Sequence, residues 1–266
     1  PVRIKVGDVK CLYVSIFPGV RATGKPLTNR ALVVKRPAKN RAVKSSQRQS
    51  QDDDGEIAGV RIIGGTLGGR HLEYSGDLRT RPMKDRVRES VFNLVGPAIA
   101  GTQALDLFAG TGALGLEAVS RGATSAILIE RHYPTSQLIK QNAQALGIEE
   151  KCAVIFGDAF LWGRKQTSAV SSVATLQSQI RNPKSEITDL KASTRWLVFC
   201  SPPYEFYVSR LPEMLELIGS LWSAAPVDSL LVVEADERFD YGLLPEPTLW
   251  DVRTYLPARI GLAQKR

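Results

Sequence analysis

The sequence predicts an α/β domain built on a mostly parallel, twisted sheet, and three observations support this fold class. Residues 104–130 form the pattern strand, glycine loop, helix, strand, which is the βαβ unit of parallel sheets. Further short apolar runs of the strand type alternate with helical patterns, at 153–156, 195–200 and 230–235. The alternating residues from Leu249 to Leu262, with Pro257 near their middle, predict a closing antiparallel strand pair.

The central βαβ unit contains a glycine loop between its first strand and its helix. The apolar run 104–108 is broken at Ala109-Gly110-Thr111-Gly112, and helical spacing of apolar residues begins at Ala113. Gly122 stands where a glycine ends a helix, and the next strand runs from Ala126 to an acidic residue, Glu130.

The glycine loop carries a nucleotide-binding pattern. Gly110, Gly112 and Gly115 spell G-x-G-x-x-G, and Glu130 stands near the place of a ribose-binding acid. Asp106 argues against a nicotinamide or flavin, because its carboxylate would repel a pyrophosphate at the loop. S-adenosylmethionine carries a sulfonium and an ammonium but no phosphate. We therefore expect Asp106 to hold its ammonium end, directly or through water, and Glu130 to take its ribose hydroxyls; the alternative is that both acids only end buried strands.

Composition narrows the class of protein. The chain has 266 residues, is 43% hydrophobic and has a formal net charge of +8, which suits one sizeable core and a polyanionic partner, nucleic acid first and an anionic membrane surface second. We find no apolar run of membrane-spanning length and no signal peptide pattern. The three cysteines are widely separated, which is typical of reduced thiols and favours a cytoplasmic location. The sequence has only two histidines, which disfavours a structural zinc site and a histidine-based catalytic triad. We expect no metal.

Residues 1–57 differ from the rest of the chain. Up to Ser50 they contain twelve lysines and arginines against the single acid Asp8, and an acidic, linker-like stretch follows at 52–56. We interpret them as a basic arm without a fixed fold. The arm could bind RNA, could direct the protein to an organelle, or could lie upstream of the true start.

Two basic elements precede the central unit. Residues 60–72 predict a glycine-containing hairpin, within an RNA-facing segment 58–78, that exposes Arg61 and Arg70. A helix capped by Thr80, with Pro82 in its first turn, is expected to extend to Val95. Its basic face carries Arg81, Lys84 and Arg88, which either contact phosphate or simply face solvent.

After the central unit, a helix is expected from Tyr133 to Leu146 and a strand at 153–156. Asp158 follows that strand and could accept a hydrogen bond from the adenine amine of the donor, or could cap the helix that starts near Phe160. Residues 163–194 are rich in polar and charged side chains, and we interpret them as a surface insertion.

The strand 195–200 leads into Ser201-Pro202-Pro203-Tyr204. Two prolines cannot continue a central strand, so the chain turns outward at the carboxyl edge of the sheet, where α/β proteins bind ligands. This corner suits methylation of an exocyclic amine. The Ser201 oxygen and the Pro202 carbonyl could accept its two N–H groups while Tyr204 stacks on the base. Orientation and electrostatics would then supply the catalysis, without a covalent intermediate.

Cys200 could be considered as the nucleophile of a C5-pyrimidine methyltransferase. It lies inside the apolar strand and lacks a neighbouring Pro-Cys dipeptide, so we expect it to be a core residue. A helix from Arg210 to Leu221 and the strand at 230–235 complete the sheet region before the closing pair.

With these motifs in place, the segment from Val60 to the C-terminus resembles the bacterial methyltransferases that modify guanine N2 in small-subunit (16S) ribosomal RNA. The resemblance rests on RIIGGTLGGRHL, RPMKDRVRESVFN, LDLFAGTGALGLEAVSRGA and PPY, in that order, over about three quarters of the chain. It implies a Rossmann-like class I methyltransferase fold, S-adenosylmethionine as donor, and ribosomal RNA or a 30S assembly particle as substrate. It also implies that the helix with Arg86 covers the cofactor, beside Phe108, Gly110 and Gly112. We expect a monomer.

Two departures from that family stand out. Ser201 replaces the usual Asp or Asn before Pro-Pro, and Ser-Pro-Pro-Tyr is more familiar from enzymes that methylate cytosine N4 in DNA. The insertion 163–194 is longer than the family's connection. A DNA amino-methyltransferase, a nicotinamide oxidoreductase and a non-catalytic RNA-binding protein of ribosome assembly therefore remain as alternatives to the ribosomal RNA enzyme.

Overall fold

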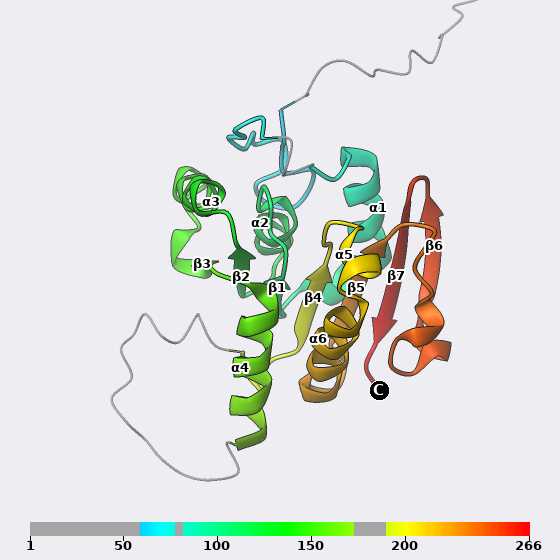
Figure 1. The fold of residues 1–266 in the computed structure, drawn as a ribbon. Helices are drawn as coiled ribbons and strands as arrows, with labels where there is room; N and C mark the ends of the chain where they lie inside the picture. Colours follow the sequence, from blue (N-terminus) through cyan, green and yellow to red (C-terminus); the bar gives the residue numbers. More distant parts are fainter. Residues whose placement is uncertain (1–58, 78–81, 173–189) are drawn as a thin grey trace, which may run out of the picture. The chain divides into compact units, whose positions relative to one another are not determined.

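The computed structural model describes residues 59–77, 82–172 and 190–266 (Figure 1). The expected basic arm 1–57, the proposed cap Thr80, the basic residue Arg81 and the middle of the expected insertion lie outside these residues. None of the helices within the described ranges has the length and apolar character needed to cross a membrane.

A seven-stranded sheet in the order β3-β2-β1-β4-β5-β7-β6 forms the centre of the described residues. Its strands are β1 (Gln103–Asp106), β2 (Ser125–Glu130), β3 (Cys152–Phe156), β4 (Trp196–Cys200), β5 (Leu230–Ala235), β6 (Asp251–Tyr255) and β7 (Ala258–Gln264). Strands β1 to β5 pair in parallel, whereas β7 pairs antiparallel with β5 and with β6. The prediction of a parallel sheet that ends in an antiparallel pair is confirmed.

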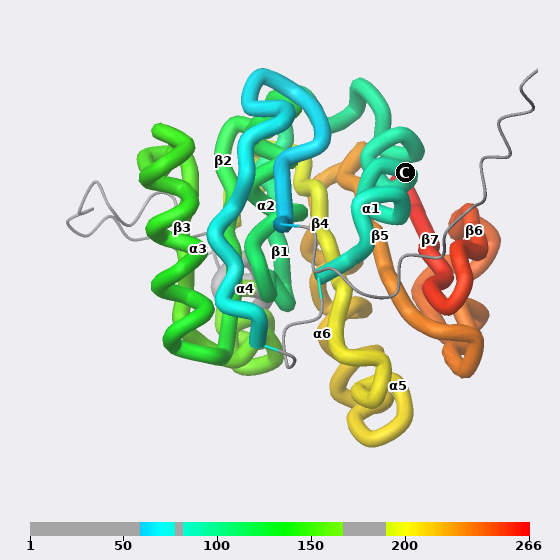
Figure 2. Tube along the Cα trace, turned by 90° about the horizontal axis from the view of Figure 1, so that it is seen from above, coloured from blue at the N-terminus to red at the C-terminus, as the bar shows by residue number. Residues whose placement is uncertain are grey.

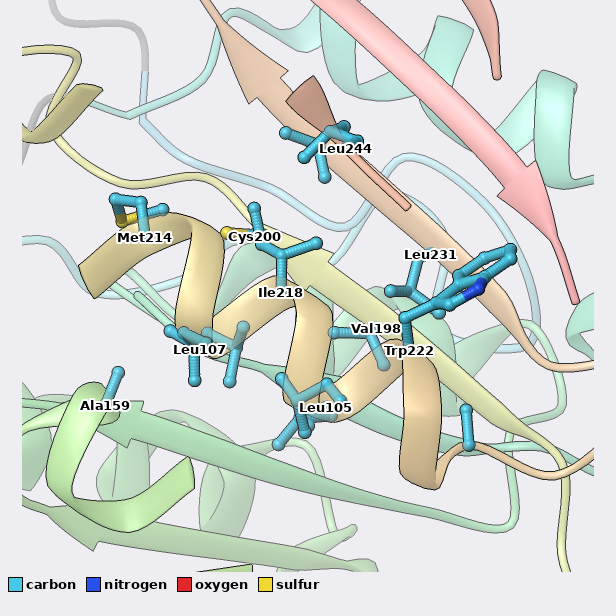
Figure 3. Close-up of a cluster of buried hydrophobic side chains, with 14 of the residues drawn as sticks. Leu105, Leu107, Ala159, Val198, Cys200, Met214, Ile218, Trp222, Leu231 and Leu244 are labelled. Carbon is cyan, nitrogen blue, oxygen red and sulfur yellow. The ribbon is translucent and has the colours of Figure 1, made fainter. Parts of the chain in front are cut away.

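Helices cover both faces of this sheet. They are α1 (Asp85–Val95), α2 (Ala113–Ser120), α3 (Tyr133–Ala145), α4 (Ala159–Ser172), α5 (Phe206–Ser209) and α6 (Leu211–Ala224), with short 3₁₀ turns between them. One hydrophobic cluster packs α4 and α6 against the sheet (Figure 3), and it includes Leu105, Val198 and Ile218. A second cluster packs α1, α2 and α3 against the opposite face. Cys200 is 3% exposed within the first cluster, and burial raises the pKa of its thiol to about 12; its expected place in the core is confirmed.

The expected insertion begins later than the sequence suggested. Residues 163–172 continue α4, which packs on α6. Gly163 is the contact point, since a Cβ there would lie 2.4 Å from Leu217 Cδ1. The polar residues 163–172 therefore belong to the helix α4, and not to the surface insertion that we expected.

Residues 59–77 run over α2 and beside α3 (Figure 2). They form the predicted hairpin, although its pairing is short: one antiparallel bridge joins Arg61 and His71. The hairpin is tied to α2, because Thr66 N–H donates to the Ser120 carbonyl at 2.8 Å. It is tied to α3 by Glu73 N–H, which donates to Asn142 Oδ1 at 2.8 Å.

Helix α1 begins later than predicted. Lys84 is its N-cap, with extended backbone angles, and the first helical residue is Asp85. Thr80 therefore does not cap the helix, and Pro82 precedes it instead of occupying its first turn. The extended stretch before α1 places Pro82 and Met83 at the pocket described below.

A buried ion pair joins α1 to α2, and it corrects the expectation that Arg88 contacts RNA. Arg88 is 1% exposed and its Nε donates to Glu117 Oε2 at 3.2 Å, where Glu117 is fully buried. Glu117 also accepts the amide hydrogens of Ile63 and Gly64 and two hydrogen bonds from Arg121. Arg88 donates further to Asp85 and to the carbonyl of Arg61. This arginine is therefore a structural residue.

Arg88→Met should lower the free energy of unfolding by about 3–5 kcal/mol, because it removes the buried cation of the Glu117 pair and leaves only the part-exposed Arg121 beside that carboxylate. The double variant Arg88→Met/Glu117→Met should recover part of this loss, since no buried charge then remains unpaired. Urea unfolding measures both values. Arg86→Ala is the matched control on the exposed side of α1 and should change stability by no more than about 0.5 kcal/mol. A loss below about 1 kcal/mol for Arg88→Met would show that Arg121 alone satisfies Glu117.

Candidate functional site

A pocket of about 520 Å³ lies at the carboxyl edge of the parallel strands, a size suited to a nucleoside-sized ligand. It is lined by the segments that follow β1 to β4, by Glu234 near the end of β5, by the turn between β6 and β7, and by the approach to α1. The lining residues are Pro82–Lys84, Val87, Leu107, Phe108, Gly110, Ile129–His132, Gly157–Phe160, Ser201–Tyr204, Phe206, Glu234 and Tyr255–Ala258. The predicted loop and the predicted proline corner therefore meet in one pocket.

Glu130 ends β2 and lines the pocket. Its Oε2 accepts the Gly110 amide hydrogen at 2.9 Å, and its Oε1 accepts the His132 amide hydrogen at 2.7 Å. These two bonds fix the carboxylate at the glycine loop. Each oxygen keeps a second lone pair that can accept a hydrogen bond from a hydroxyl group.

Asp106 ends β1 but does not line the pocket. It is 1% exposed, and its Oδ2 accepts the Gly115 amide hydrogen at 3.1 Å. Among the described residues, its Oδ1 has no hydrogen-bond partner. Burial, opposed by the Gly115 hydrogen bond and assisted by Glu130, raises the pKa of this carboxyl to about 7. The expected direct contact with a ligand ammonium is therefore not supported, because the side chain is buried and does not line the pocket; the contact through water stays a prediction.

The last two glycines of the G-x-G-x-x-G pattern serve packing. Gly112 has φ +78°, and a Cβ there would lie 2.9 Å from Ile139 Cγ2 on α3. A Cβ on Gly115 would lie 2.7 Å from Leu128 Cδ2 on β2. Neither residue lines the pocket, whereas Gly110 does. The expectation that Gly112 contacts the donor is therefore replaced by a role in holding α2 close to its neighbours.

Asp158 follows β3 and caps α4. Its Oδ1 accepts the amide hydrogens of Phe160 and Leu161 at 2.8 and 3.2 Å, so the capping alternative is confirmed. Its Oδ2 lies 4.0 Å from Arg210 Nη1, and the residue lines the pocket. One carboxylate oxygen therefore remains available to a ligand.

Three aromatic rings form the wall of the pocket next to the glycine loop. The Phe108 ring centroid lies 5.8 Å from that of Phe160 and 6.0 Å from that of Phe206. Arg210 covers this wall, with its guanidinium carbon 3.9 Å from the Phe160 ring centroid. Phe108 was expected at the site from sequence, whereas Phe160 and Phe206 were not. Phe160 and Phe206 are single aromatic residues at the starts of α4 and α5, and no sequence pattern around them predicts a place in the pocket.

The proline corner meets a carboxylate that sequence reasoning missed. Ser201 Oγ donates a short hydrogen bond to Glu234 Oε2, and Tyr204 Oη donates to Glu234 Oε1 at 2.7 Å. Glu234 is 8% exposed on β5, beside β4 in the parallel pairing. Burial and the Glu234 carboxylate raise the pKa of Tyr204 well above its usual value. The one available signal was an acid inside the apolar run Leu230–Ala235.

The basic residues expected to bind RNA have different environments. Arg61 and Arg70 are exposed on the hairpin, and Arg61 Nε pairs with Asp85 Oδ2 at 2.9 Å. Lys84 is exposed and lines the pocket. Arg86 is exposed on α1 but is not part of the pocket lining, so its expected contact with the cofactor is not supported.

The polar groups that line the pocket disfavour phosphate-containing ligands and favour cationic ones. The Gly110 amide, which would bind a pyrophosphate in a dinucleotide site, is already occupied by the Glu130 carboxylate. A phosphate would meet that carboxylate at close range. A cationic nucleoside with free ribose hydroxyls fits the same groups. The proline corner and Glu234 face the rest of the pocket with hydrogen-bond acceptors.

Several of the known proteins that this chain is similar to are named as methyltransferases. The family model described as "Conserved hypothetical protein 95" matches residues 60–176. The chain is 32% identical over 212 residues to "Putative rRNA methyltransferase YlbH" of Bacillus subtilis (strain 168), covering 78% of this chain and 100% of that protein. It is 49% identical over 87 residues to "Ribosomal RNA small subunit methyltransferase D" of Escherichia coli (strain K12), covering 33% of this chain and 44% of that protein. The solved structure "Putative methyltransferase yhhF from Escherichia coli" is 30% identical, with a TM-score of 0.54 and coverage of 78% of this chain and 98% of that one.

Asp106→Asn should remove a pH dependence from the free energy of unfolding. Because burial raises the pKa of Asp106 to about 7, the folded protein binds this proton more tightly than the unfolded chain, whose aspartates titrate near pH ~4. The resulting stability is complete below the unfolded pKa and is lost as the pH rises through the folded pKa. Relative to the variant, the wild-type protein should lose on the order of 4 kcal/mol over this interval.

Urea unfolding of both proteins at several pH values measures this difference. A stability difference between them that stays constant with pH would contradict the raised pKa. Asp251→Asn, at an exposed residue paired with Arg253, is the control and should leave the pH dependence of the wild-type protein in place.

Proposed function

Because the chain belongs to the conserved hypothetical protein 95 family, with YlbH and the ribosomal RNA small subunit methyltransferases D among its relatives, we propose that it methylates the exocyclic N2 amine of a guanine in small-subunit ribosomal RNA. The donor is S-adenosylmethionine. Membership of this family confirms the relationship expected from the sequence motifs. The parallel sheet with its antiparallel end is the class I methyltransferase-like fold.

The observation that carries the proposal is the occupation of the Gly110 amide by the Glu130 carboxylate. Glu130 Oε2 accepts the Gly110 amide hydrogen, so the loop amide at the pocket that a dinucleotide would use for phosphate is not free. A phosphate-free, positively charged donor avoids this conflict. The same observation disfavours the nicotinamide oxidoreductase.

The chain's own residues would hold the donor at three points. Glu130 accepts hydrogen bonds from the ribose hydroxyls, and the free oxygen of Asp158 accepts one from the adenine amine. The aromatic wall of Phe108, Phe160 and Phe206 excludes water from the reacting end. When bound, S-adenosylmethionine supplies a methyl group that its sulfonium charge makes electrophilic.

The proline corner would hold the acceptor base. The Ser201 oxygen and the Pro202 carbonyl accept the N–H groups of the amine and orient its lone pair towards the donor end of the pocket. Tyr204, whose hydroxyl is fixed by Glu234, stacks on the base. Catalysis is then a matter of orientation and electrostatics, and no covalent intermediate on Cys200 is needed.

Methyl transfer from labelled S-adenosylmethionine tests the reaction and its substrate. Purified protein is incubated with 30S particles, naked ribosomal RNA and duplex DNA, and the modified nucleotide is identified by mass spectrometry. Label in N2-methylguanine of the RNA is the expected result. Incorporation only into DNA would overturn the proposal in favour of the cytosine-N4 enzyme suggested by Ser201. Absence of S-adenosylhomocysteine binding in calorimetry would favour the non-catalytic RNA-binding protein.

Glu130→Ala should weaken S-adenosylhomocysteine binding by about tenfold or more, because hydrogen bonds to a charged acceptor contribute about 1.5–3 kcal/mol each. Isothermal titration calorimetry measures the dissociation constant. Glu149→Ala removes an exposed acid outside the pocket and should leave the affinity unchanged. Equal affinities for wild type and Glu130→Ala would contradict the ribose contact.

Arg70→Ala/Lys84→Ala should reduce affinity for ribosomal RNA and reduce its salt dependence. Each lost phosphate contact should lower the slope of log K against log salt by about 0.7–0.9. Filter binding at several salt concentrations gives both values. Lys151→Ala changes an exposed lysine away from the hairpin and the pocket and serves as the control. An unchanged slope would show that these two side chains do not contact phosphate.

A further inference from the structure

Ser201, Tyr204 and Glu234 form a hydrogen-bonded group at one end of the pocket, which we call the acceptor cluster. Both hydroxyl groups donate to the same carboxylate, Ser201 to Oε2 and Tyr204 to Oε1 at 2.7 Å. All three residues line the pocket. The cluster joins the end of β4 to β5, so the pairing of these strands fixes its geometry.

The direction of these hydrogen bonds determines what the cluster can bind. A carboxylate only accepts hydrogen bonds, and a hydroxyl group has a single proton to donate. Since the hydroxyl groups of Ser201 and Tyr204 both donate their hydrogen bond to Glu234, they can only accept hydrogen bonds from a ligand. The Pro202 carbonyl beside them is also only an acceptor. The side chains of Ser201, Tyr204 and Glu234 and the Pro202 carbonyl therefore offer acceptors to this end of the pocket and no free donor.

An acceptor-only surface discriminates between the bases that carry an exocyclic amine. On the Watson–Crick side of guanine the N2 amine lies beside N1–H, so two adjacent donors face an acceptor surface there, while the acceptor N3 lies on the other side of the amine. On the Watson–Crick side of cytosine and adenine the amine lies beside a ring nitrogen that is itself an acceptor and would face the lone pairs of the cluster. Unpaired buried polar groups of this kind reject a wrong substrate strongly. The acceptor cluster thus complements guanine.

Resting on the proposed methyl transfer, we propose that Glu234 is the positioning residue that makes Ser201 an effective acceptor and selects guanine over cytosine. By accepting the hydrogen bond from the Ser201 hydroxyl, Glu234 directs the lone pairs of Ser201 Oγ to the target amine. It also increases the negative charge on that oxygen. The Asp or Asn that the resembling enzymes carry before Pro-Pro is here replaced by a hydroxyl just after β4 that is backed by a carboxylate on β5.

The same group accounts for the proton that the reaction releases. Transfer of the methyl group breaks the sulfur–carbon bond of the donor, forms a nitrogen–carbon bond and leaves one surplus proton on the base nitrogen. That proton passes to Ser201 Oγ as the Ser201 proton passes to Glu234 Oε2. Glu234 becomes neutral, offsetting the positive charge lost from sulfur, and then releases its proton to water.

Glu234 is held rigidly enough for this role. It is 8% exposed, and it lies in β5 between β4 on one side and β7 on the other, where it is paired with Ile260. Its carbonyl accepts a hydrogen bond from Tyr207 Oη at 3.0 Å. Both its backbone and its side chain are therefore fixed from neighbouring elements.

The test combines kinetics with a binding measurement that involves no turnover. Glu234→Gln should reduce kcat by about 100-fold, within the range of general acid–base effects, while S-adenosylhomocysteine affinity stays within about twofold. Ser201→Asp alone should also reduce kcat, because it places two carboxylates in contact. The double variant Ser201→Asp/Glu234→Gln should regain at least about tenfold over Glu234→Gln, because one carboxylate is restored.

The binding arm uses the RNA fragment that carries the modified nucleotide, with guanosine or inosine at that position, and protein saturated with S-adenosylhomocysteine. Inosine lacks only the N2 amine, so wild type should bind the guanosine fragment more tightly and Glu234→Gln should lose this preference. Glu237→Gln, at an exposed acid three residues further along and outside the pocket, is the control and should behave as wild type. Thermal melting verifies that each variant is folded.

The outcomes separate this inference from the proposed function. An active wild type with a Glu234→Gln variant of equal kcat and equal preference for guanosine would overturn the role of Glu234 and leave the methyltransferase proposal standing. A loss of kcat in Glu234→Gln that Ser201→Asp does not restore would also overturn it, because the residue would then be structural. Wild type that transfers methyl groups to cytosine would overturn both.

Discussion

The fully buried carboxylate of Glu117 holds together the elements that surround the pocket on the α1 side. It accepts hydrogen bonds from the hairpin amides of Ile63 and Gly64, from Arg88 on α1 and from Arg121 after α2. A buried charge is tolerated only when it is paired and hydrogen-bonded, so these contacts form as a set. Because α1 is fixed in this way, the residues just before it, Pro82 to Lys84, are placed at the pocket. Stability and site geometry are thus coupled through one side chain.

The order of the strands explains why the pocket is rich in acceptors. Glu130 and Asp158 lie at or just after the ends of β2 and β3, Glu234 lies near the end of β5, and all three line the pocket. Parallel pairing brings all these ends to one edge. The edge therefore repels phosphates and favours cations and amine hydrogens. The glycine loop, which in a dinucleotide enzyme supplies free amides, here gives the Gly110 amide to the Glu130 carboxylate.

Sequence patterns predicted the sheet well, because buried parallel strands and glycine stops are local features. They predicted the loop, Glu130 and the proline corner as one site for the same reason. Sequence patterns failed where the role of a side chain depends on a contact with a residue that is distant in the chain. Arg88 shares the spacing of a solvated basic face until Glu117 is placed against it. Glu234 resembles an interruption in an apolar strand until β4 brings Ser201 beside it. Residues 163–172 looked like a polar insertion because the packing of Gly163 on Leu217 leaves no periodic signal.

The residue before Pro-Pro does not by itself identify the target base, because a hydroxyl group takes its role from its partner. A serine whose partner is a donor keeps its own proton free to donate to the base. Ser201 instead donates to Glu234 and therefore presents lone pairs to the base. Tyr204 is constrained in the same way. A serine corner backed by a buried carboxylate is thus electrostatically closer to an aspartate corner than to an isolated serine. Ser-Pro-Pro-Tyr shares its sequence motif with cytosine enzymes, but the choice of base depends on the direction of the hydrogen bonds in the acceptor cluster.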